Sequence, residues 1–142
     1  MKIKKLCSNA IIPKYQTKCS AGLDLHSIED VELIPNERKL IGTGLAMEIP
    51  IGFEGQVRPR SGLAVKHGIT VLNSPGTIDS DFRGEVKVIL INHSDKSFMI
   101  NEGDRIAQLI ISSVKQVEIE EVKELTETER GEGGFGSTGR NN

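Results

Sequence analysis

Two carboxylates and one aromatic ring lie within the four residues Asp79-Ser80-Asp81-Phe82. The segment follows Asn73-Ser74-Pro75-Gly76, which is typical of a turn, and leads into an alternating stretch from Glu85 to Asn92. A carboxylate on a turn that is backed by a rigid strand can hold a small molecule against a general base. We therefore expect a catalytic site at this hairpin turn.

The C-terminal segment is rich in glycine, with five Gly among the ten residues from Arg130 to Gly139. Closely spaced glycines let backbone N–H groups surround an anion, and Arg130, Ser137 and Thr138 add further donors. The segment is not a Walker loop, because it has no Gly-Lys-Ser/Thr sequence. Its composition is also that of a flexible tail, but Phe135 favours an arm that closes over a ligand.

Each of three other positions has more than one possible role. Arg60-Ser61-Gly62 could bind phosphate at the start of a short helix capped by Ser61, or could be a capped helix with a surface arginine. Gln108 interrupts an apolar run. It could contact a ligand, or it could be a core amide that is hydrogen-bonded to backbone. Asp24 lies between two leucines. It could be an exposed residue, a partner of an arginine or a group that orients a metal-bound water.

The elements that must position these residues are almost all short strands. Turn signals every 8–12 residues, roughly, separate about eight to ten apolar segments, a pattern that predicts an antiparallel sandwich or barrel. We expect an all-β, jelly-roll-like antiparallel β-sandwich or barrel over residues 1–122, with one short helix, and a flexible Gly-rich arm over 123–142. These strands are expected among the candidate segments 3–6, 20–25, 31–34, 38–41, 45–49 (after an interruption at 42–44), 53–58, 70–72, 85–92, 97–100, 104–114 and 117–122. The expected helix covers 61–66 and ends at Gly68.

Bulk properties exclude several functional classes. The chain has 142 residues, a net charge of −2 and no Trp, so we expect one domain and no nucleic-acid partner. No apolar run is long enough for a signal peptide or a membrane span, so we expect no membrane association. Cys7 and Cys19 are then two free thiols of a cytoplasmic protein, and three scattered His make a protein-ligated zinc improbable.

Taken together, the pieces resemble one family, the trimeric deoxyuridine triphosphate nucleotidohydrolases (dUTPases). The resemblance covers five segments in the same order, spanning residues 21–139. They are Ala21-Gly22-Leu23-Asp24-Leu25, Arg60-Ser61-Gly62-Leu63-Ala64, the run from Gly76 to Glu85, the run from Gly103 to Gln108, and the run from Arg130 to Gly139.

The resemblance implies a homotrimer in which three subunits build each active site, and the C-terminal arm of one covers the site of another. The implied reaction is hydrolysis of dUTP to dUMP and pyrophosphate by attack of water on the α-phosphorus. It would keep uracil out of DNA and supply dUMP for thymidylate synthesis. The implied cofactor is Mg²⁺, held by the triphosphate and by waters and not by direct protein ligands.

The resemblance also implies a role for each matching residue. Asp79 would be the general base that orients the attacking water, and Phe82 would lie under the deoxyribose and reject a ribose 2′-hydroxyl. Lys87 would occupy a substrate-contacting position, and Asp24 would hold a metal-bound water. The uracil edge would be read by Asn73 and the backbone around Gly76, Thr77 and Ile78.

The remaining implied contacts go to phosphates and to the top of the base. Phe135 would stack over uracil, within an arm that includes Gly136. Phosphate oxygens would be bound by Arg60, Ser61, Gly62 and Gln108, and the terminal phosphate by Arg130, Ser137 and Thr138.

The chain departs from the family pattern at Phe82, where the family most often has Tyr. A Phe keeps the flat ring and loses only a hydroxyl, so we expect sugar discrimination to survive, though weakened. Two rival interpretations remain: a dCTP deaminase, which needs a Glu near the pyrimidine amine where this turn offers Asp79 and Asp81, and a non-catalytic β-sandwich that binds a nucleotide signal or a partner protein.

Overall fold

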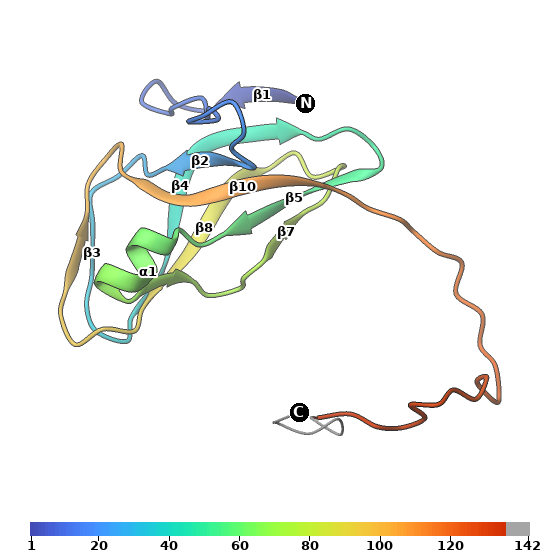
Figure 1. Cartoon of the computed structure of the whole chain (residues 1–142). Coiled ribbons are helices and arrows are strands. Elements are labelled where there is room, and N and C mark those ends of the chain that lie inside the picture. Colours follow the sequence, from blue (N-terminus) through green and yellow to red (C-terminus); the bar gives the residue numbers. More distant parts are fainter. Residues whose placement is uncertain (136–142) are drawn as a thin grey trace.

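The structure is a computed structural model and describes residues 1–135. Two four-stranded sheets pack face to face, a two-stranded sheet closes one end, and a single short helix lies beside them (Figure 1). The strands are β1 (Lys2–Lys5), β2 (Gly22–His26), β3 (Val31–Leu33), β4 (Arg38–Glu48), β5 (Phe53–Arg58), β6 (Ile69–Val71), β7 (Gly76–Ile78), β8 (Glu85–Asn92), β9 (Phe98–Ile100) and β10 (Arg105–Ser113), and the helix is α1 (Ser61–His67).

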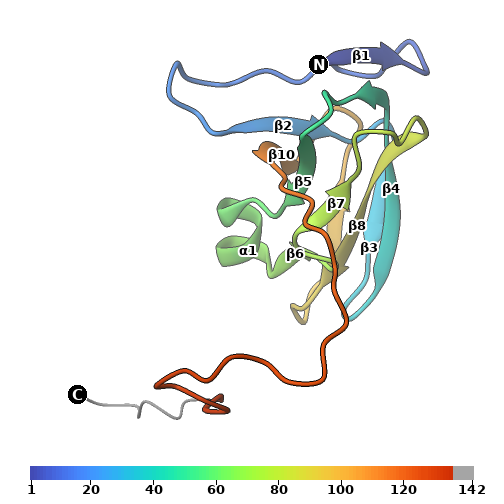
Figure 2. The ribbon, with the colours of Figure 1, turned by 90° about the vertical axis from the view of Figure 1, so that its right-hand side faces the viewer.

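All strand pairs are antiparallel. The first sheet has the order β1-β4-β8-β6, the second β2-β10-β5-β7, and the third pairs β3 with β9. The second view separates the two large sheets, with β4 and β8 in one and β10 and β5 in the other (Figure 2). The predicted all-β class, with one short helix, is confirmed.

Alternation along β8 shows how sequence sets the core. Val86, Val88 and Leu90 are fully buried, whereas Lys87 between them is exposed. Because side chains of a strand alternate between its faces, the buried set faces the second sheet and the rest face outward. β10 lies between β2 and β5, and its Ala107 and Leu109 are completely buried in the same core.

Two predicted boundaries are wrong. The glycines at 42 and 44 do not interrupt a strand: β4 runs through them, and its pairing with β8 shifts register between Gly42 and Ala46. Gly44 has φ +64°, and a Cβ there would lie 2.5 Å from the Cys7 sulfur, so this irregularity requires glycine. The weak alternation at residues 117–122 forms no strand, and the segment is exposed coil that leaves the body of the molecule (Figure 1).

Helix α1 ends as predicted at Gly68, in the left-handed region with φ 66°. The predicted cap is wrong, because the N-cap residue is Arg60 and no side chain caps the helix. Among residues 1–135, we find no helix with the length and apolar character needed to span a bilayer.

Candidate functional site

The strand register brings three of the candidate segments to one end of the second sheet. Gln108 of β10 pairs with Asp24 of β2 on one side and with Arg58 of β5 on the other. The chain then turns at Pro59 into α1, which places Arg60 beside them. Gln108 is half-buried, and its side-chain Nε2 donates to the Pro59 carbonyl at 3.0 Å. The bond to backbone is therefore observed, and because Gln108 also lines the hollow described below, a ligand contact stays a prediction.

One carboxylate holds two arginines here. Asp24 Oδ2 accepts from Arg105 Nη1 at 3.1 Å, and Asp24 Oδ1 lies 3.5 Å from Arg60 Nε. Arg60 also donates through Nη1 to the Arg105 carbonyl at 2.8 Å. The Asp24 side chain is only 12% exposed, so among its readings the partner of an arginine is the one the structure shows. Two positive charges against one negative charge leave a net positive cluster, which suits phosphate oxygens.

This arginine cluster, defined as Asp24, Arg60 and Arg105, borders a hollow of about 270 Å³. Ser61 is exposed at its rim. The sequence predicted neither Arg105 nor Gln16 as part of a site. The hollow is lined by Gln16, Asp24, Arg60, Ser61, Gly62, Arg105 and Gln108.

A histidine lies next to the cluster. His26 pairs with Arg105 in the β2–β10 register, and its Nδ1 is buried without a hydrogen-bond partner among residues 1–135. Burial lowers the pKa of His26 below its usual value. The nearby Arg105 and Arg60 guanidinium groups lower the pKa further, whereas the Asp24 carboxylate opposes the shift. His26 is therefore neutral in the folded protein at neutral pH.

The second candidate group is the turn that carries Asp79. It is closed by the Phe82 N–H, which donates to the Asp79 carbonyl at 3.2 Å. The Arg83 guanidinium donates back to the carbonyls of Ser80 and Phe82 at 2.7 and 2.9 Å. The expected hairpin is wrong, because β7 pairs with β5 whereas β8 pairs with β4 and β6. The turn instead links the two large sheets.

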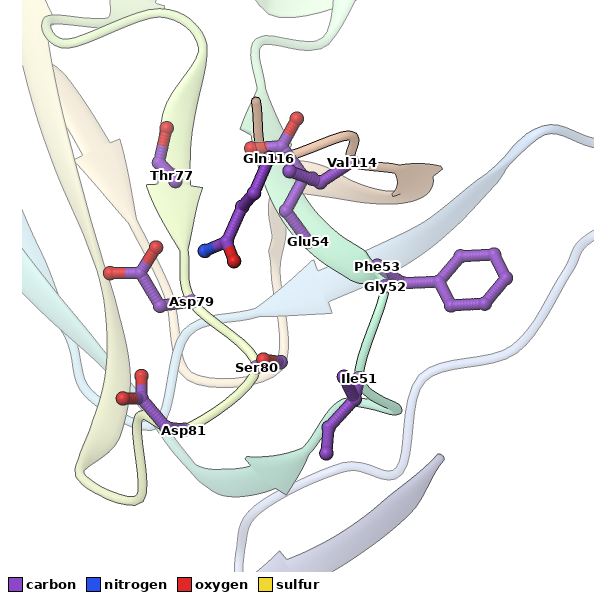
Figure 3. Close-up of a pocket in the computed structure, with 10 residues that line it drawn as sticks. All are labelled: Ile51, Gly52, Phe53, Glu54, Thr77, Asp79, Ser80, Asp81, Val114 and Gln116. Carbon is purple, nitrogen blue, oxygen red and sulfur yellow. The ribbon is translucent and has the colours of Figure 1, made fainter. Parts of the chain in front are cut away.

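The turn borders a larger hollow of about 580 Å³ (Figure 3). The Gln116 side chain reaches toward Asp79, and the Phe53 ring points the other way (Figure 3). Neither Glu54 nor Gln116 was predicted from the sequence. Glu54 lies near the start of β5 and Gln116 follows the end of β10, and the antiparallel pairing of these two strands brings them to the same end. The lining residues are Ile51, Gly52, Phe53, Glu54, Thr77, Asp79, Ser80, Asp81, Val114 and Gln116.

Residues before the turn also fold back on it. Ser74–Pro75 is a cis peptide bond, and a Cβ on Gly76 would lie 3.1 Å from Asn73 Nδ2. The predicted uracil-reading residues Asn73 and Gly76 therefore lie together, and β7 continues through Thr77 and Ile78 toward Asp79.

The lining of this hollow does not include four other predicted residues, Phe82, Lys87, Arg130 and Phe135. The Phe82 ring does not line the hollow and instead packs over Gly84. Lys87 is on the outer face of β8, with its Nζ 3.4 Å from Glu85 Oε2. In the arm, Arg130 Nε donates to the Gly133 carbonyl at 2.8 Å, and Phe135 is fully exposed. The predicted contacts at Gly136, Ser137 and Thr138 lie outside the described residues.

The arginine cluster and Asp79 are at opposite ends of β5. Ile78, just before Asp79, pairs with Gly55 near the start of the strand, whereas Arg60 follows its end. A strand of this length extends about 20 Å at about 3.3 Å per residue. The two hollows share no lining residue. The described part of one chain therefore does not bring the carboxylate and the arginines to one small molecule.

No group of three or more His, Cys, Asp or Glu side chains that could hold a metal ion occurs within residues 1–135. Both oxygens of Asp24 already contact guanidinium groups. The described residues therefore fit a bound metal ion only if substrate oxygens and waters supply the ligands of that ion.

Comparison with known proteins gives consistent matches. The family model described as dUTPase matches residues 8–139. The deoxyuridine 5'-triphosphate nucleotidohydrolase of Nautilia profundicola is 69% identical over 140 residues, which cover 99% of each chain.

Solved structures that resemble this chain are also dUTPases. A Staphylococcus bacteriophage 80alpha dUTPase with dUPNHPP has a TM-score of 0.92 and 32% identity, with 98% of each chain covered. A mutant dUTPase from phage phi11 of S. aureus, described with a structural Mg(II) ion, has a TM-score of 0.83 and 28% identity, over 89% of this chain and 98% of that one.

Proposed function

This chain belongs to the dUTPase family, and we propose that it hydrolyses dUTP to dUMP and pyrophosphate by attack of water on the α-phosphorus. The observation that carries the proposal is the family match over residues 8–139. It includes both the Asp79 turn and the arginine cluster. The reaction removes dUTP before it can enter DNA and supplies dUMP for thymidylate synthesis.

Asp79 is the general base. It lies on an exposed turn whose backbone is held by two Arg83 hydrogen bonds and by the Phe82 N–H, so the carboxylate is carried by an ordered backbone at the edge of a hollow. A base held in this way orients a water against phosphorus, and phosphoryl transfer needs positioning and charge neutralisation more than covalent help.

The base and the sugar are recognised next to Asp79. Asn73 and the backbone of Gly76, Thr77 and Ile78 read the uracil edge, and the Phe82 ring forms the wall under the deoxyribose. Lys87 contributes only at the edge of this site, because its side chain is drawn toward Glu85.

The arginine cluster binds the phosphate chain. Arg60 is held on two sides, by Asp24 and by the Arg105 carbonyl, so little side-chain freedom remains to be lost when phosphate binds. Ser61 and Gly62 offer a hydroxyl and an unhindered backbone beside it. Gln108 Nε2 has a second proton for a phosphate oxygen after donating to Pro59.

The site is completed by other copies of the chain. Asp79 and Arg60 lie too far apart within one subunit to contact one triphosphate, so a homotrimer supplies them from neighbouring subunits. The arm of residues 123–142 of one subunit covers the site of another. In that site, Phe135 stacks over uracil, and the phosphates are contacted by Arg130, Gly136, Ser137 and Thr138. Residues 1–122 are the β domain that holds these parts.

The residues described above would leave the ligands of Mg²⁺ to triphosphate oxygens and waters. The ion would supply positive charge that neutralises the phosphates. Asp24 would hold it only through a water. The free thiols of Cys7 and Cys19 suit a reducing cytoplasm.

The test is product analysis after incubation with dUTP, UTP, dTTP and dCTP, with and without Mg²⁺. We expect dUMP and pyrophosphate from dUTP when Mg²⁺ is present, and Asp79→Asn should lower that turnover by about 10²–10⁴-fold while dUTP still binds. Asp95→Asn, in the exposed loop after β8, is the matched control and should keep wild-type turnover. Deamination of dCTP, or binding without any hydrolysis, would overturn the proposal.

A further inference from the structure

The Phe82 ring lies so close to residue 84 that a side chain at position 84 would collide with it. A Cβ on Gly84 would be 2.6 Å from Phe82 Cζ and 3.0 and 3.4 Å from its Cε2 and Cε1. Non-bonded carbon atoms are most stable about 3.5–4.0 Å apart. The observed ring orientation therefore requires glycine at position 84.

The backbone of Gly84 does not explain the glycine. Gly84 is not among the residues with positive φ, so alanine can adopt its backbone conformation without strain. The conflict is with the Phe82 ring alone, so a Gly84→Ala substitution acts on that ring.

The backbone of Phe82 cannot easily move away. Its N–H donates to the Asp79 carbonyl at 3.2 Å, and its carbonyl accepts from Arg83 Nη1 at 2.9 Å. The same nitrogen of Arg83 donates to the Ser80 carbonyl, which ties both ends of the turn together. A methyl group at position 84 would therefore push the ring and leave the turn in place.

We propose that Gly84 is a positioning residue that sets the orientation of the Phe82 ring and, through it, the selectivity for deoxyribose over ribose. The inference rests on the proposed function, in which this ring is the wall under the sugar. Phe82 has no hydroxyl and is 42% exposed, so its ring orientation depends on the few groups that it packs against, and the Gly84 backbone is one of them. A wall excludes one hydroxyl group only if it is held within a narrow range of positions.

The first experiment tests the contact without any activity. In the wild-type protein, NMR should show nuclear Overhauser effects between the Phe82 ring protons and the Gly84 α-protons, with Phe82→Leu used to assign the ring signals. In Gly84→Ala, the ring signals should shift while the backbone amide signals of Asp79 and Ser80 stay close to their wild-type positions. Absence of the wild-type contacts would overturn the proposal, even if Gly84→Ala failed to fold.

The second experiment measures kcat/KM for dUTP and for UTP in a double-mutant cycle. Gly84→Ala should lower the dUTP-to-UTP selectivity by about fivefold, the size expected for a ring moved off its preferred rotamer. In the Phe82→Ala background, the matched control, the same substitution should leave selectivity unchanged because no ring remains to move.

An equal loss of selectivity in both backgrounds, or no loss in either, would overturn the role of Gly84. Wild-type turnover of dUTP, measured first, tests the proposed function separately.

Discussion

Asp24 is the residue on which the arrangement of the arginine cluster depends. Its carboxylate, only 12% exposed, holds Arg60 and Arg105 side by side. Without that carboxylate the two guanidinium groups repel each other. In the proposed site, Asp24 therefore orders the arginines that would bind phosphate.

We therefore expect Asp24→Asn to raise KM for dUTP by about tenfold, since the loss of one charge-assisted pair is worth about 1.4 kcal/mol. The kcat value should change less, because Asp79 is untouched. Steady-state kinetics on folded protein checks this, and a variant with wild-type KM would contradict the role given to Asp24.

His26 adds a pH dependence to the same region. Burial and the nearby Arg105 and Arg60 lower the pKa of His26 below the value of about 6.5 that it has in the unfolded chain. The unfolded chain then binds more protons between these two pKa values. The contribution of His26 to stability is therefore fully present above about pH 6.5 and is lost as the pH falls through the folded pKa.

We expect His26→Gln to flatten part of the acid-side decline. Chemical denaturation between pH 7.5 and 5 should show a shallower loss of unfolding free energy in the variant than in the wild type. Equal slopes in the two proteins would contradict a buried neutral His26.

At this scale the sequence named Asp24 but could not say what it does. Its partner Arg105 is 81 positions away, and only the β2–β10 register shows that they meet. The sequence alone places Arg105 beside Asp104, which suggests an ion pair between neighbours. In the structure Asp104 instead accepts from the Asn101 N–H at 2.8 Å.

At the scale of elements, Asn92 joins β8 to the small β3–β9 sheet. It is fully buried, and its Nδ2 donates to the carbonyls of Leu33 and Lys96 at 3.0 and 2.7 Å. Its Oδ1 accepts from the N–H and hydroxyl of Ser94. The amide therefore uses its full hydrogen-bonding capacity.

We expect Asn92→Ala to lower the free energy of unfolding by about 2–4 kcal/mol, because it removes a buried amide and its hydrogen bond to the buried Leu33 carbonyl. Urea denaturation checks this. Thr70→Ala on the neighbouring strand β6, a half-buried residue, is the matched control and should cost less than about 1 kcal/mol. Equal costs for the two variants would contradict the special role of Asn92.

The elements that the sequence predicted best are those with strong local signals. The bounds of β5 and β8 match the prediction, because Pro59 ends the first and strict alternation marks the second. β4 was split in two because glycine usually weakens a strand, whereas here Gly44 makes room for Cys7 and Ala10. The 117–122 segment was predicted as a strand, but it pairs with no strand in the part of the chain that the structure describes.

At the scale of the whole molecule, the arm is separate from the body. The described residues from Lys115 to Phe135 add no buried residue to the core. Deletion of residues 130–142 should therefore leave folding and assembly unchanged and reduce dUTP turnover to a few per cent of wild type or less, because the site can no longer close. Size-exclusion chromatography and turnover check this, and a truncated protein with full turnover would contradict the role of the arm.

Five segments of the sequence were enough to indicate the dUTPase family, and the family match confirms that prediction. The sequence did not show that the Asp79 turn and the arginine cluster lie at opposite ends of β5, because motif order along the chain carries no distance. Their separation is seen only in the strand register of the folded chain. That separation is the reason for proposing that neighbouring copies share each site.

The most direct test of this shared site mixes two inactive variants, Asp79→Asn and Arg60→Ala, and lets their subunits exchange. Each variant alone should be nearly inactive. If each site takes Asp79 from one copy and Arg60 from another, a random equal mixture regains about a quarter of wild-type dUTP turnover, because that share of sites receives both intact residues. A mixture that exchanges subunits and stays as inactive as its components would contradict the account.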